Sequence, residues 1–416
     1  MDAEATYSEV AGRAAPAAED ARPEMAIFGE WDTANLGKRA MHGEVVRFFE
    51  ECGWRVSSYG LGSLSVAAPD GAHARLGGRS SALRAAVECL SPGIGRAVRG
   101  VRRRIRMQQL LPRLERLQAI SICGVLLSDG VRHLPQSLLE ISRMARLLNK
   151  PLLCLGCSAD GAWSGTGEPM VREILENCTL IAVRDEATVD SVARLTGAAP
   201  PVFGDFYLSE QRVQAGAERV AARRDLGVNV SQLPGPWSSA QQRYEDALVA
   251  LSNRVARSMA ERGCGIRIFT TGIPADGRAA ERVFARLELP GAELYLPRNV
   301  AQLSGMVHTT AAVVATRLHG AVLPLAEGVP VAGFSATPGL ANFFSTMGIK
   351  RFCHCLDAHA ELAEWLAKAD PEAWFEEQRR ALVHSRVWAA RAEVRTELAS
   401  IARQVPERES LEDRCA

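Results

Sequence analysis

The stretch AAVVATRLHGAVLPLAEGVPVAGF, residues 311–334, combines a strand, a turn, a helix and a second strand in one short segment. Its first run of apolar, β-branched residues ends at Thr316, and the second run begins at Pro330. A helical pattern of apolar residues lies between them, from His319 to Glu327. Strands that are joined by a helix lie parallel in one sheet, so this segment predicts a parallel α/β unit.

The same alternation of short apolar runs and helical patterns extends on both sides of this segment. In the first half of the chain we expect strands at residues 25–29, 54–59, 119–127, 151–155, 179–183 and 201–203. In the second half we expect strands at residues 227–230, 265–270, 292–296, 312–315 and 330–334. The sequence therefore predicts an α/β protein of two doubly wound, Rossmann-like domains that face a cleft, where ligands bind beyond the carboxyl ends of the strands.

Changes in composition along the chain give the expected domain boundaries. Residues 1–24 hold six acids, two bases and many alanines, which predicts a disordered acidic tail. We expect the N-terminal α/β domain at residues 25–210 and the C-terminal α/β domain, with the RLHG segment, at residues 211–370. Residues 371–416 lack strand patterns and predict closing helices followed by a tail.

The overall composition excludes several classes of protein. With 47 % hydrophobic and 23 % charged residues, the 416-residue chain is globular rather than fibrous or disordered. Its 49 basic residues balance 48 acidic ones, so the net charge of +1 gives no general attraction to nucleic acid. The start lacks the pattern of a secretory signal, and no apolar run reaches the ~18 residues of a membrane helix. We expect a soluble, cytoplasmic protein.

The turn after the strand at residues 312–315 is the most informative candidate site. It carries Arg317 and His319 at the N-terminus of a helix, where free amides and the helix dipole favour a bound anion. Gly320 permits close approach of the backbone. A phosphate or carboxylate fits such a turn, and a capped structural residue is the alternative interpretation of His319.

Two turns in the first half also carry charged residues. Arg184 and Asp185 end the strand at residues 179–183, where they could bind a second anionic group or form only a local ion pair. Asp205 follows the short strand at residues 201–203, at the end of the first domain. Each of these side chains is expected at the carboxyl end of a strand, where ligands bind.

The loop IFGEWDTANLGK, residues 27–38, connects the first strand to the first helix. Its Gly29 and Gly37 suit close approach of the backbone to a ligand, and Asn35 can cap the helix or donate a hydrogen bond. The GxGxxG fingerprint of dinucleotide-binding loops is absent.

Taken in order, these segments resemble the polysaccharide pyruvyl transferase family. That family carries a Gly and Asn loop after its first strand, an Arg-Asp-x-x-Ser/Thr turn, an Asp before the interdomain linker, and an Arg-x-His-Gly segment leading to a Gly-x-Pro strand. The matching residues are Gly29, Asn35 and Gly37; Arg184, Asp185 and Thr188; Asp205; and Arg317, His319, Gly320, Gly328 and Pro330. The resemblance covers residues 25–370. It implies a GT-B-type fold and a polysaccharide pyruvyl transferase of polysaccharide, exopolysaccharide or glycoconjugate biosynthesis.

The implied reaction moves a pyruvyl group from phosphoenolpyruvate to sugar hydroxyls, commonly as a cyclic ketal. The donor carries a carboxylate and a phosphate, which need at least two forked cations. Arg317 and Arg184 meet that need, one from each domain, and Arg298 after the strand at residues 292–296 is a further candidate. Phosphoenolpyruvate is a co-substrate, and the scheme needs no cofactor and no metal.

The resemblance also gives candidates for proton transfer. His319 is the candidate general acid, or else a phosphate ligand that assists departure of the leaving group. Asp129, Asp32 or Asp185 is the candidate base, and Asp129 is the one we place in the catalytic set. The other residues expected to line the substrate site are Gly29, Asn35, Asp185, Asp205 and Gly320.

Three positions depart from the family pattern. Lys38 stands where the family usually has Asp, the residues Ser128, Asp129 and Gly130 replace a Gly-rich turn, and the loop SATPG ends in Gly339 instead of Lys. The donor residues are kept, so a changed acceptor, whether a sugar, a lipid-linked glycan or a nucleotide-linked glycan, is the simplest interpretation. Two alternatives are a GT-B nucleotide-sugar glycosyltransferase that uses Glu327, and a non-catalytic member that binds a glycan.

Residues 96–116 hold eight arginines and one glutamate, with apolar residues at nearly helical spacing. This pattern predicts a basic amphipathic helix, from Arg96 to Arg116. The helix could present a solvated face, contact anionic lipid at the inner face of the membrane, or attract an acidic glycan. Nucleic acid is not expected as a partner, because the stretch has no aromatic residue to stack on a base.

Overall fold

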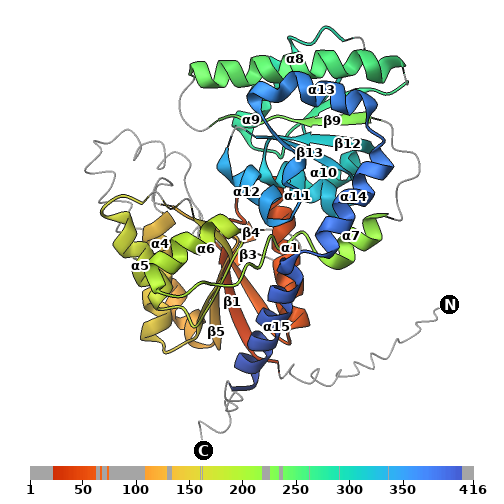
Figure 1. Ribbon diagram of the computed structural model, residues 1–416. Helices are drawn as coiled ribbons and strands as arrows, with labels where there is room; N and C mark the ends of the chain where they lie inside the picture. Colours follow the sequence, from red (N-terminus) through yellow and green to blue (C-terminus); the bar gives the residue numbers. More distant parts are fainter. Residues whose placement is uncertain are drawn as a thin grey trace, which may run out of the picture.

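The structure, a computed structural model, describes residues 22–61, 66–67, 73–74, 108–128, 134–159, 161, 163–217, 225–233, 238–261, 263–289, 291–335 and 337–404. These residues form two sheets with flanking helices, which occupy the lower and upper halves of Figure 1. Of the expected acidic tail, only residues 22–24 lie within the described part. The expected basic helix is described only from residue 108 onward, where its buried residues include Leu110 and Leu114.

The first domain is built on the lower sheet of Figure 1. Its strands are β1 (Glu24–Gly29), β2 (Arg55–Gly60), β3 (Val66–Ala67), β4 (His73–Ala74), β5 (Ala119–Cys123), β6 (Leu126–Leu127), β7 (Leu152–Ala159) and β8 (Leu180–Val183). Its helices are α1 (Leu36–Glu51), α4 (Leu134–Leu147), α5 (Gly167–Glu176) and α6 (Glu186–Thr196). The parallel part has the order β2-β1-β5-β7-β8. Every residue of β5 and β7 is buried, as expected for a parallel sheet covered on both faces.

The second domain is built on the upper sheet. Its strands are β9 (Asp225–Asn229), β10 (Ile266–Phe269), β11 (Glu293–Tyr295), β12 (Thr310–Ala315), β13 (Val331–Ser335) and β14 (Cys353–Cys355). Its helices are α8 (Ser239–Glu261), α9 (Pro274–Phe284), α10 (Val300–His308), α11 (Leu318–Ala326), α12 (Pro338–Thr346), α13 (His359–Lys368) and α14 (Pro371–Val383). The parallel order β11-β10-β9-β12-β13-β14 corresponds to the Rossmann order 3-2-1-4-5-6.

The segment that predicted the fold forms β12, α11 and β13. Its helix is apolar on all sides, and residues 319–326 are all buried. The helix is followed by its cap Glu327 and then by Gly328, whose φ of +74° is in the left-handed region that glycine favours. A Cβ at this position would also lie 2.1 Å from the backbone oxygen of Gly216, so no other residue fits.

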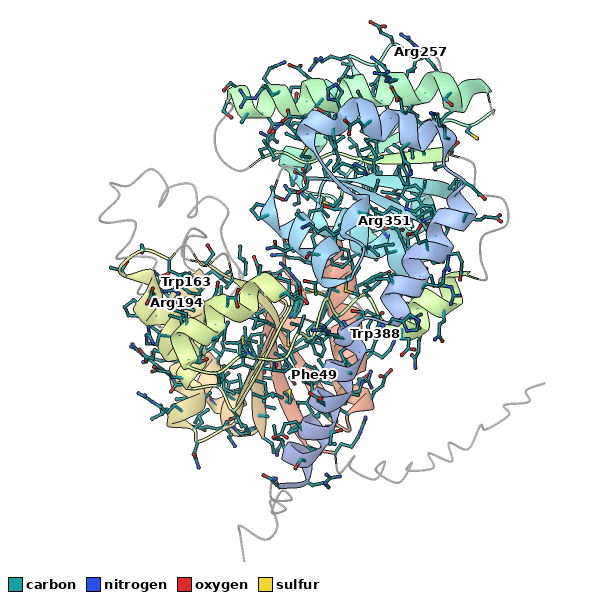
Figure 2. All side chains as sticks on the ribbon, in the orientation of Figure 1. Phe49, Trp163, Arg194, Arg257, Arg351 and Trp388 are labelled. Carbon is teal, nitrogen blue, oxygen red and sulfur yellow. The ribbon has the colours of Figure 1, made fainter. Side chains whose placement is uncertain are left out.

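Helix α15 (Arg386–Gln404) carries the chain from the second domain back onto the first. In Figure 1 this blue helix runs beside the red and orange elements of the first sheet, and in Figure 2 Trp388 marks the place where it leaves the second domain. Leu398 and Ile401 pack in one apolar cluster with Phe49 and Trp54. The indole of Trp54 donates a hydrogen bond to the backbone oxygen of Leu398, at 3.3 Å. The closing helix therefore completes the core of the first domain.

The two-domain α/β fold with C-terminal helices is confirmed, and most differences lie at short elements. Residues 201–203 form no full strand, and only an isolated bridge joins Val202 to Val183. Strand β14 and helix α13 were not expected, because Cys353, His354 and Cys355 do not form a clear apolar run. Helix α7 (Glu210–Ala217) lies across the expected domain boundary, between residues 210 and 211.

Candidate functional site

The second sheet reverses its strand order between β9 and β12, the point where ligands bind in doubly wound folds. Asn229 ends β9 and is fully buried. Its side-chain oxygen accepts a hydrogen bond from the backbone N–H of Arg317, at 3.1 Å. A Cβ at Gly320 would lie 2.2 Å from that same oxygen. The close approach expected at Gly320 is therefore made by Asn229, which fixes the turn at the start of α11.

Arg317 forms a forked ion pair with Asp276 near the start of α9. Its Nε lies 2.5 Å from one carboxylate oxygen and its terminal nitrogen 2.6 Å from the other. Asp276 is fully buried and also accepts a hydrogen bond from the backbone of Gln232, at 2.8 Å. The Arg317 side chain keeps 32 % of its surface exposed. Arg317 is therefore held in place by Asp276, with part of its side chain still accessible.

His319 and Asp205 face each other from the two domains, and we call them the His319 pair. Both are buried, and the distance from His319 Nε2 to Asp205 Oδ2 is 3.7 Å. Neither of these two atoms has a hydrogen-bond partner among the described residues. The other oxygen of Asp205 accepts from the backbone N–H of Tyr207, at 3.0 Å. The pair thus contains a fixed carboxylate and an imidazole whose facing atoms are unsatisfied.

The pKa of His319 is lowered from 6.5 to about 4. Burial is the main cause, and the carboxylate of Asp205 opposes it. The positive charges of Arg184, Lys38 and Arg317 lower the pKa further. His319 is therefore neutral at pH 7, and it lies within electrostatic reach of cations from both domains.

The loop after β1 packs against the second domain. Asn35 caps α1 by accepting hydrogen bonds from the backbone of Gly37 and Lys38. The backbone N–H of Leu36 donates to the oxygen of Thr271 in the second domain, at 2.7 Å. A Cβ at Gly37 would lie 2.2 Å from the Cβ of His319. Gly37 therefore lets the start of α1 approach the RLHG turn.

Other residues of this loop contact protein groups. A Cβ at Gly29 would lie 2.0 Å from the ring of Trp31, which is almost fully buried. Lys38 forms an ion pair with Glu30. Asp32 lies beside Gly60, where a Cβ would approach its carboxylate carbon to 2.7 Å. The space next to Gly29 is thus filled by Trp31.

Arg184 and Asp185 lie at the carboxyl end of β8, as expected. The guanidinium of Arg184 donates to the hydroxyl of Ser158, at 2.6 Å, and its Nε lies 3.5 Å from Asp185 Oδ2. Asp185 caps α6 and accepts from both the backbone N–H and the hydroxyl of Thr188, at 3.1 and 2.7 Å. The local ion contact, one of the two expected roles of the pair, is present, and Asp185 also caps α6, which the sequence did not predict.

Two predicted residues do not join this group. Arg298 is exposed in the turn between β11 and α10, and within the described ranges its side chain has no ion-pair partner. Asp129 lies outside the described residues. The group around His319 therefore consists of Asp205, Gly37 and the three cations that act on its pKa.

A second polar cluster also joins the domains, and we call it the Arg212 cluster. Arg212 pairs with Glu44 of α1 and with Glu327 at the end of α11, the latter at 2.8 Å. Glu327 also accepts from the hydroxyl of Tyr207 at 3.2 Å and contacts the imidazole of His308 at 2.8 Å. Burial opposes ionisation of Glu327, yet His308 and Arg212 lower its pKa. The carboxylate of Glu327 is thus fully paired with protein groups, at the end of α11 that lies away from the RLHG turn.

Sequence reasoning missed three residues that build the site. Asn229 and Asp276 fix the Arg317 turn, and Arg391 of α15 donates to the backbone oxygens of Phe203 and Leu208, at 2.8 and 2.7 Å. Arg391 also donates a hydrogen bond to the backbone oxygen of Asp205. Asn229 gave a signal, because it is a polar residue at the end of an apolar strand. Asp276 and Arg391 gave none, since their partners are distant in sequence.

The described residues include no helix long and apolar enough to cross a membrane. Within the same part of the chain, Cys154 and Cys157 are buried free thiols. Burial is the main cause that raises the pKa of Cys157 well above its usual value, so it is an unreactive core residue.

Two Rossmann-type sheets joined by crossing C-terminal helices define a GT-B-like protein, and solved structures match this fold. HepE of Anabaena, solved with UDP and glucose, gives a TM-score of 0.52 at 11 % identity and covers 91 % of this chain and 100 % of its own. MnaA of S. aureus, solved with UDP, gives 0.54 at 9 % identity and covers 94 % and 99 %. A putative UDP-N-acetylglucosamine 2-epimerase of Listeria monocytogenes gives 0.54 at 9 % identity and covers 93 % and 98 %.

The sequence assigns the chain within this class. Residues 97–337, more than half of the 416, match the polysaccharide pyruvyl transferases. The chain therefore belongs to the polysaccharide pyruvyl transferase family, and the resemblance expected from its motifs is confirmed. The matched range contains Arg184, Asp205, Arg317 and His319, whereas the loop at residues 27–38 precedes it. No curated protein matches the sequence.

Proposed function

We propose that this protein transfers a pyruvyl group from phosphoenolpyruvate to hydroxyls of a sugar or sugar-containing intermediate, with ketal formation. The observation that carries the proposal is the convergence of three cations from both domains on the unsatisfied His319 pair. Arg184 and Lys38 come from the first domain and Arg317 from the second, and all three lower the pKa of His319. Such a group of cations favours a multiply charged anion, as the donor is.

The two arginines suit the two ends of the donor. Arg317 lies at the N-terminus of α11, where free amides add to the attraction for a phosphate or a carboxylate. Arg184 is 16 % exposed and is held by Ser158 and Asp185, so its guanidinium is fixed before a ligand arrives. Because each arginine belongs to a different domain, a bound donor would bridge the domains.

The reaction starts with protonation of the methylene carbon of phosphoenolpyruvate. The positive charge that forms on the neighbouring carbon is attacked by the first sugar hydroxyl, which gives up its proton to a base. The bond from that carbon to the phosphate oxygen then breaks and releases inorganic phosphate. A second hydroxyl attacks the same carbon, loses its proton and closes the ketal.

His319 is the proton donor in this proposal. Without the donor it is neutral, because burial and three cations lower its pKa to about 4. Bound phosphoenolpyruvate offsets those cations and adds negative charge, so the pKa of His319 rises and the ring takes up a proton. The carboxylate of Asp205, whose Oδ2 lies 3.7 Å from His319 Nε2, stabilises the imidazolium. Asp185 is a poor candidate for the base, since it caps α6.

The experiment is incubation with phosphoenolpyruvate and a panel of sugars, nucleotide-linked sugars and lipid-linked sugars, with release of phosphate and mass gain of the acceptor as readouts. Arg184→Ala should raise the KM for phosphoenolpyruvate about tenfold or more, since a charge-assisted hydrogen bond is worth ~1.5–3 kcal/mol. Arg143→Ala removes an exposed arginine of the same domain and serves as the matched control. Equal KM values in Arg184→Ala and wild type would contradict the assignment.

Arg317→Ala is a less clean test, because it also leaves the carboxylate of Asp276 buried without its cation. Its loss of activity should therefore be compared with its melting temperature. Arg317→Lys keeps the charge and loses the fork, so it should fold well and bind the donor more weakly.

A second candidate function is nucleotide-sugar transfer, since HepE and MnaA were solved with UDP. For that reaction Glu327 was the candidate residue for binding the diphosphate. In the structure its carboxylate is already hydrogen-bonded to Arg212, Tyr207 and His308. Thermal stabilisation by a UDP-sugar but not by phosphoenolpyruvate would favour this second function. Stabilisation by phosphoenolpyruvate with phosphate release supports pyruvyl transfer, and binding without turnover of any acceptor supports a glycan-binding role.

A further inference from the structure

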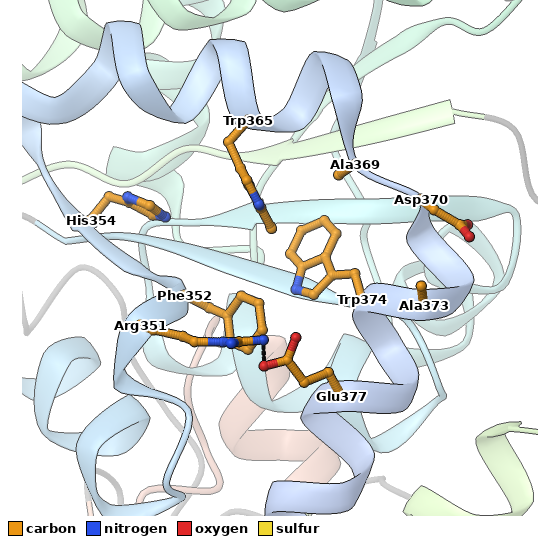
Figure 3. A pocket seen from close by; sticks show the side chains of 9 residues that line it. All are labelled: Arg351, Phe352, His354, Trp365, Ala369, Asp370, Ala373, Trp374 and Glu377. Atoms are coloured by element: carbon orange, nitrogen blue, oxygen red, sulfur yellow. Dashed lines mark ion pairs between the residues drawn. The ribbon is translucent and has the colours of Figure 1, made fainter.

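The second domain contains a pocket of about 440 Å³ beside β14, which Figure 3 shows from close by. Residues before and within β14 form one wall, and residues of α13, of α14 and of the turn between these helices form the other. The side chains that matter most are Arg351, Phe352, Trp365, Asp370, Trp374 and Glu377. This volume lies within the usual range of small-molecule sites, ~300–1,000 Å³.

The pocket is separate from the His319 pair. Strands β12, β13 and β14 run parallel. His319 follows the carboxyl end of β12, whereas the pocket lies beside β14, two strands away. Ala315 of β12 is level with Gly333 of β13 and Cys353 of β14, so the pocket is displaced sideways across the sheet, by about 10 Å for two strand spacings. The residues that line the pocket are distinct from those of the His319 group. The pocket has no role in the chemistry proposed above.

The interior of the pocket is aromatic. The rings of Trp365 and Trp374 lie 4.5 Å apart in an edge-on arrangement, and those of Phe352 and Trp374 lie 6.1 Å apart and nearly stacked. Phe352 and Trp374 are 5 % and 4 % exposed, and Trp365 is half-buried. Trp365 therefore offers aromatic surface to a ligand while the other two rings support it.

The polar groups of the pocket include one unsatisfied donor. The indole N–H of Trp374 is buried and has no hydrogen-bond partner in the described part of the chain. Arg351 and Glu377 form an ion pair, drawn in Figure 3, and their side chains are 61 % and 40 % exposed. Asp370 is exposed and also lines the pocket. The site thus combines aromatic faces with two carboxylates, a guanidinium and an indole donor.

We propose that this pocket binds a neutral sugar residue of a glycan, as an auxiliary site outside the reaction centre. A sugar ring has apolar C–H faces, which pack on an aromatic ring, and hydroxyl edges, which need both donors and acceptors. Trp365 supplies the face, Arg351 and Glu377 supply groups of both kinds, and the N–H of Trp374 gains an acceptor. The ligand class follows from the pocket itself and goes beyond pyruvyl transfer.

The charges of the pocket disfavour the other ligands that aromatic sites take. A quaternary ammonium group would be repelled by the guanidinium of Arg351, which already lies over the Phe352 ring, at 4.6 Å. A phosphate would meet the carboxylates of Asp370 and Glu377 against a single cation. A neutral polar ligand meets neither penalty.

The test is calorimetric titration of the full chain with neutral tetrasaccharides of glucose, galactose and N-acetylglucosamine, and with choline and inorganic phosphate. Trp365→Ala should weaken tetrasaccharide binding about tenfold, because it removes the stacking surface. Trp374→Phe keeps an aromatic ring, removes the N–H and should weaken binding severalfold. Trp163→Phe, in the first domain, should bind as wild type does, and melting temperatures show that each variant is folded.

The outcomes separate this proposal from the proposed function. His319→Gln should keep tetrasaccharide affinity, and Trp365→Ala should keep phosphate release from phosphoenolpyruvate with a small acceptor. Absence of binding by every tetrasaccharide overturns the auxiliary site, as does binding that Trp365→Ala and Trp374→Phe leave unchanged. Binding of choline or phosphate in place of the saccharides overturns the assigned ligand class.

Discussion

Two polar clusters lie where the domains meet, and their buried charged atoms are satisfied to different degrees. In the Arg212 cluster each carboxylate oxygen of Glu44 and Glu327 has a partner, although the Nε of Arg212 is buried without one among the described residues. In the His319 pair the two facing atoms have none among the described residues. An unsatisfied buried polar atom costs ~1–3 kcal/mol. The difference indicates that the Arg212 cluster holds the domains together, whereas the His319 pair is arranged for a ligand.

The largest expected effect is on activity, at the His319 pair. His319→Gln should lower kcat for phosphate release about 1,000-fold, within the range of general acid catalysis. Its melting temperature should stay close to that of wild type, because the replaced nitrogen has no partner to lose. Asp205→Asn should lower activity less, and the exposed Asp190→Asn is its matched control.

A His319→Gln variant with a much lower melting temperature would contradict this difference between the clusters, since both would then stabilise the fold. A His319→Gln variant with wild-type turnover would also contradict it, since the His319 pair would then have no role in the reaction.

The Arg212 cluster should show the opposite result. Arg212→Met leaves Glu44 and Glu327 buried without their shared cation, and should lower the free energy of unfolding by about 3 kcal/mol. Urea unfolding measures this loss. Arg254→Met breaks an exposed pair with Glu364 and should cost less than ~1 kcal/mol. Equal losses in the two variants would show that the cluster adds nothing to stability.

The dependence of stability on pH in the acid range tests the His319 pair separately from the Arg212 cluster. Its pKa is 6.5 in an unfolded chain and about 4 in the folded protein, so the unfolded state takes up the proton first. Stability is therefore complete above pH 6.5 and falls as the pH decreases to 4, by about 3 kcal/mol in total. His319→Gln should remove that part of the acid sensitivity. Parallel pH curves for variant and wild type would mean that His319 titrates normally.

The smallest expected effect concerns the contact between the start of α1 and the RLHG turn. Gly37→Ala places a Cβ where it would lie 2.2 Å from the Cβ of His319, and should cost ~1–3 kcal/mol and lower activity. Gly43→Ala, on the same helix, has nothing within 4 Å of its new Cβ and should stabilise by ~0.5–1 kcal/mol. Activity and melting temperature should separate these two variants, and equal behaviour would mean that the close approach carries no function.

The fold could be predicted largely because its signals are local. The apolar runs at residues 312–315 and 330–334 and the helix between them form β12, β13 and α11 with small shifts at their ends. Strand β14 escaped prediction because three residues are too short to show a pattern. Helix α15 could be predicted as a helix, but nothing in its sequence indicated that it packs on the first sheet.

The candidate site could be predicted only in part. Arg184, Arg317 and His319 were found because each follows a strand of a parallel sheet, and such positions meet at one edge. Asp205 was found because it follows the apolar run at residues 201–203, which forms only one parallel bridge, between Val202 and Val183. Arg298 was selected by the same rule, yet it is exposed in its turn, because the rule does not say which turn faces the other domain.

The amino-acid sequence by itself determined the two α/β units, the family and the residues at the ends of the strands, since these depend on periodicity and on short motifs. Only the tertiary structure decided which atoms are paired. In the tertiary structure Arg317 forms its ion pair with Asp276, and Gly37 packs closely against His319. His319 Nε2 and Asp205 Oδ2 face each other without hydrogen-bond partners among the described residues. The physical reason is that pairing depends on distances between residues far apart in the chain, which no local pattern encodes.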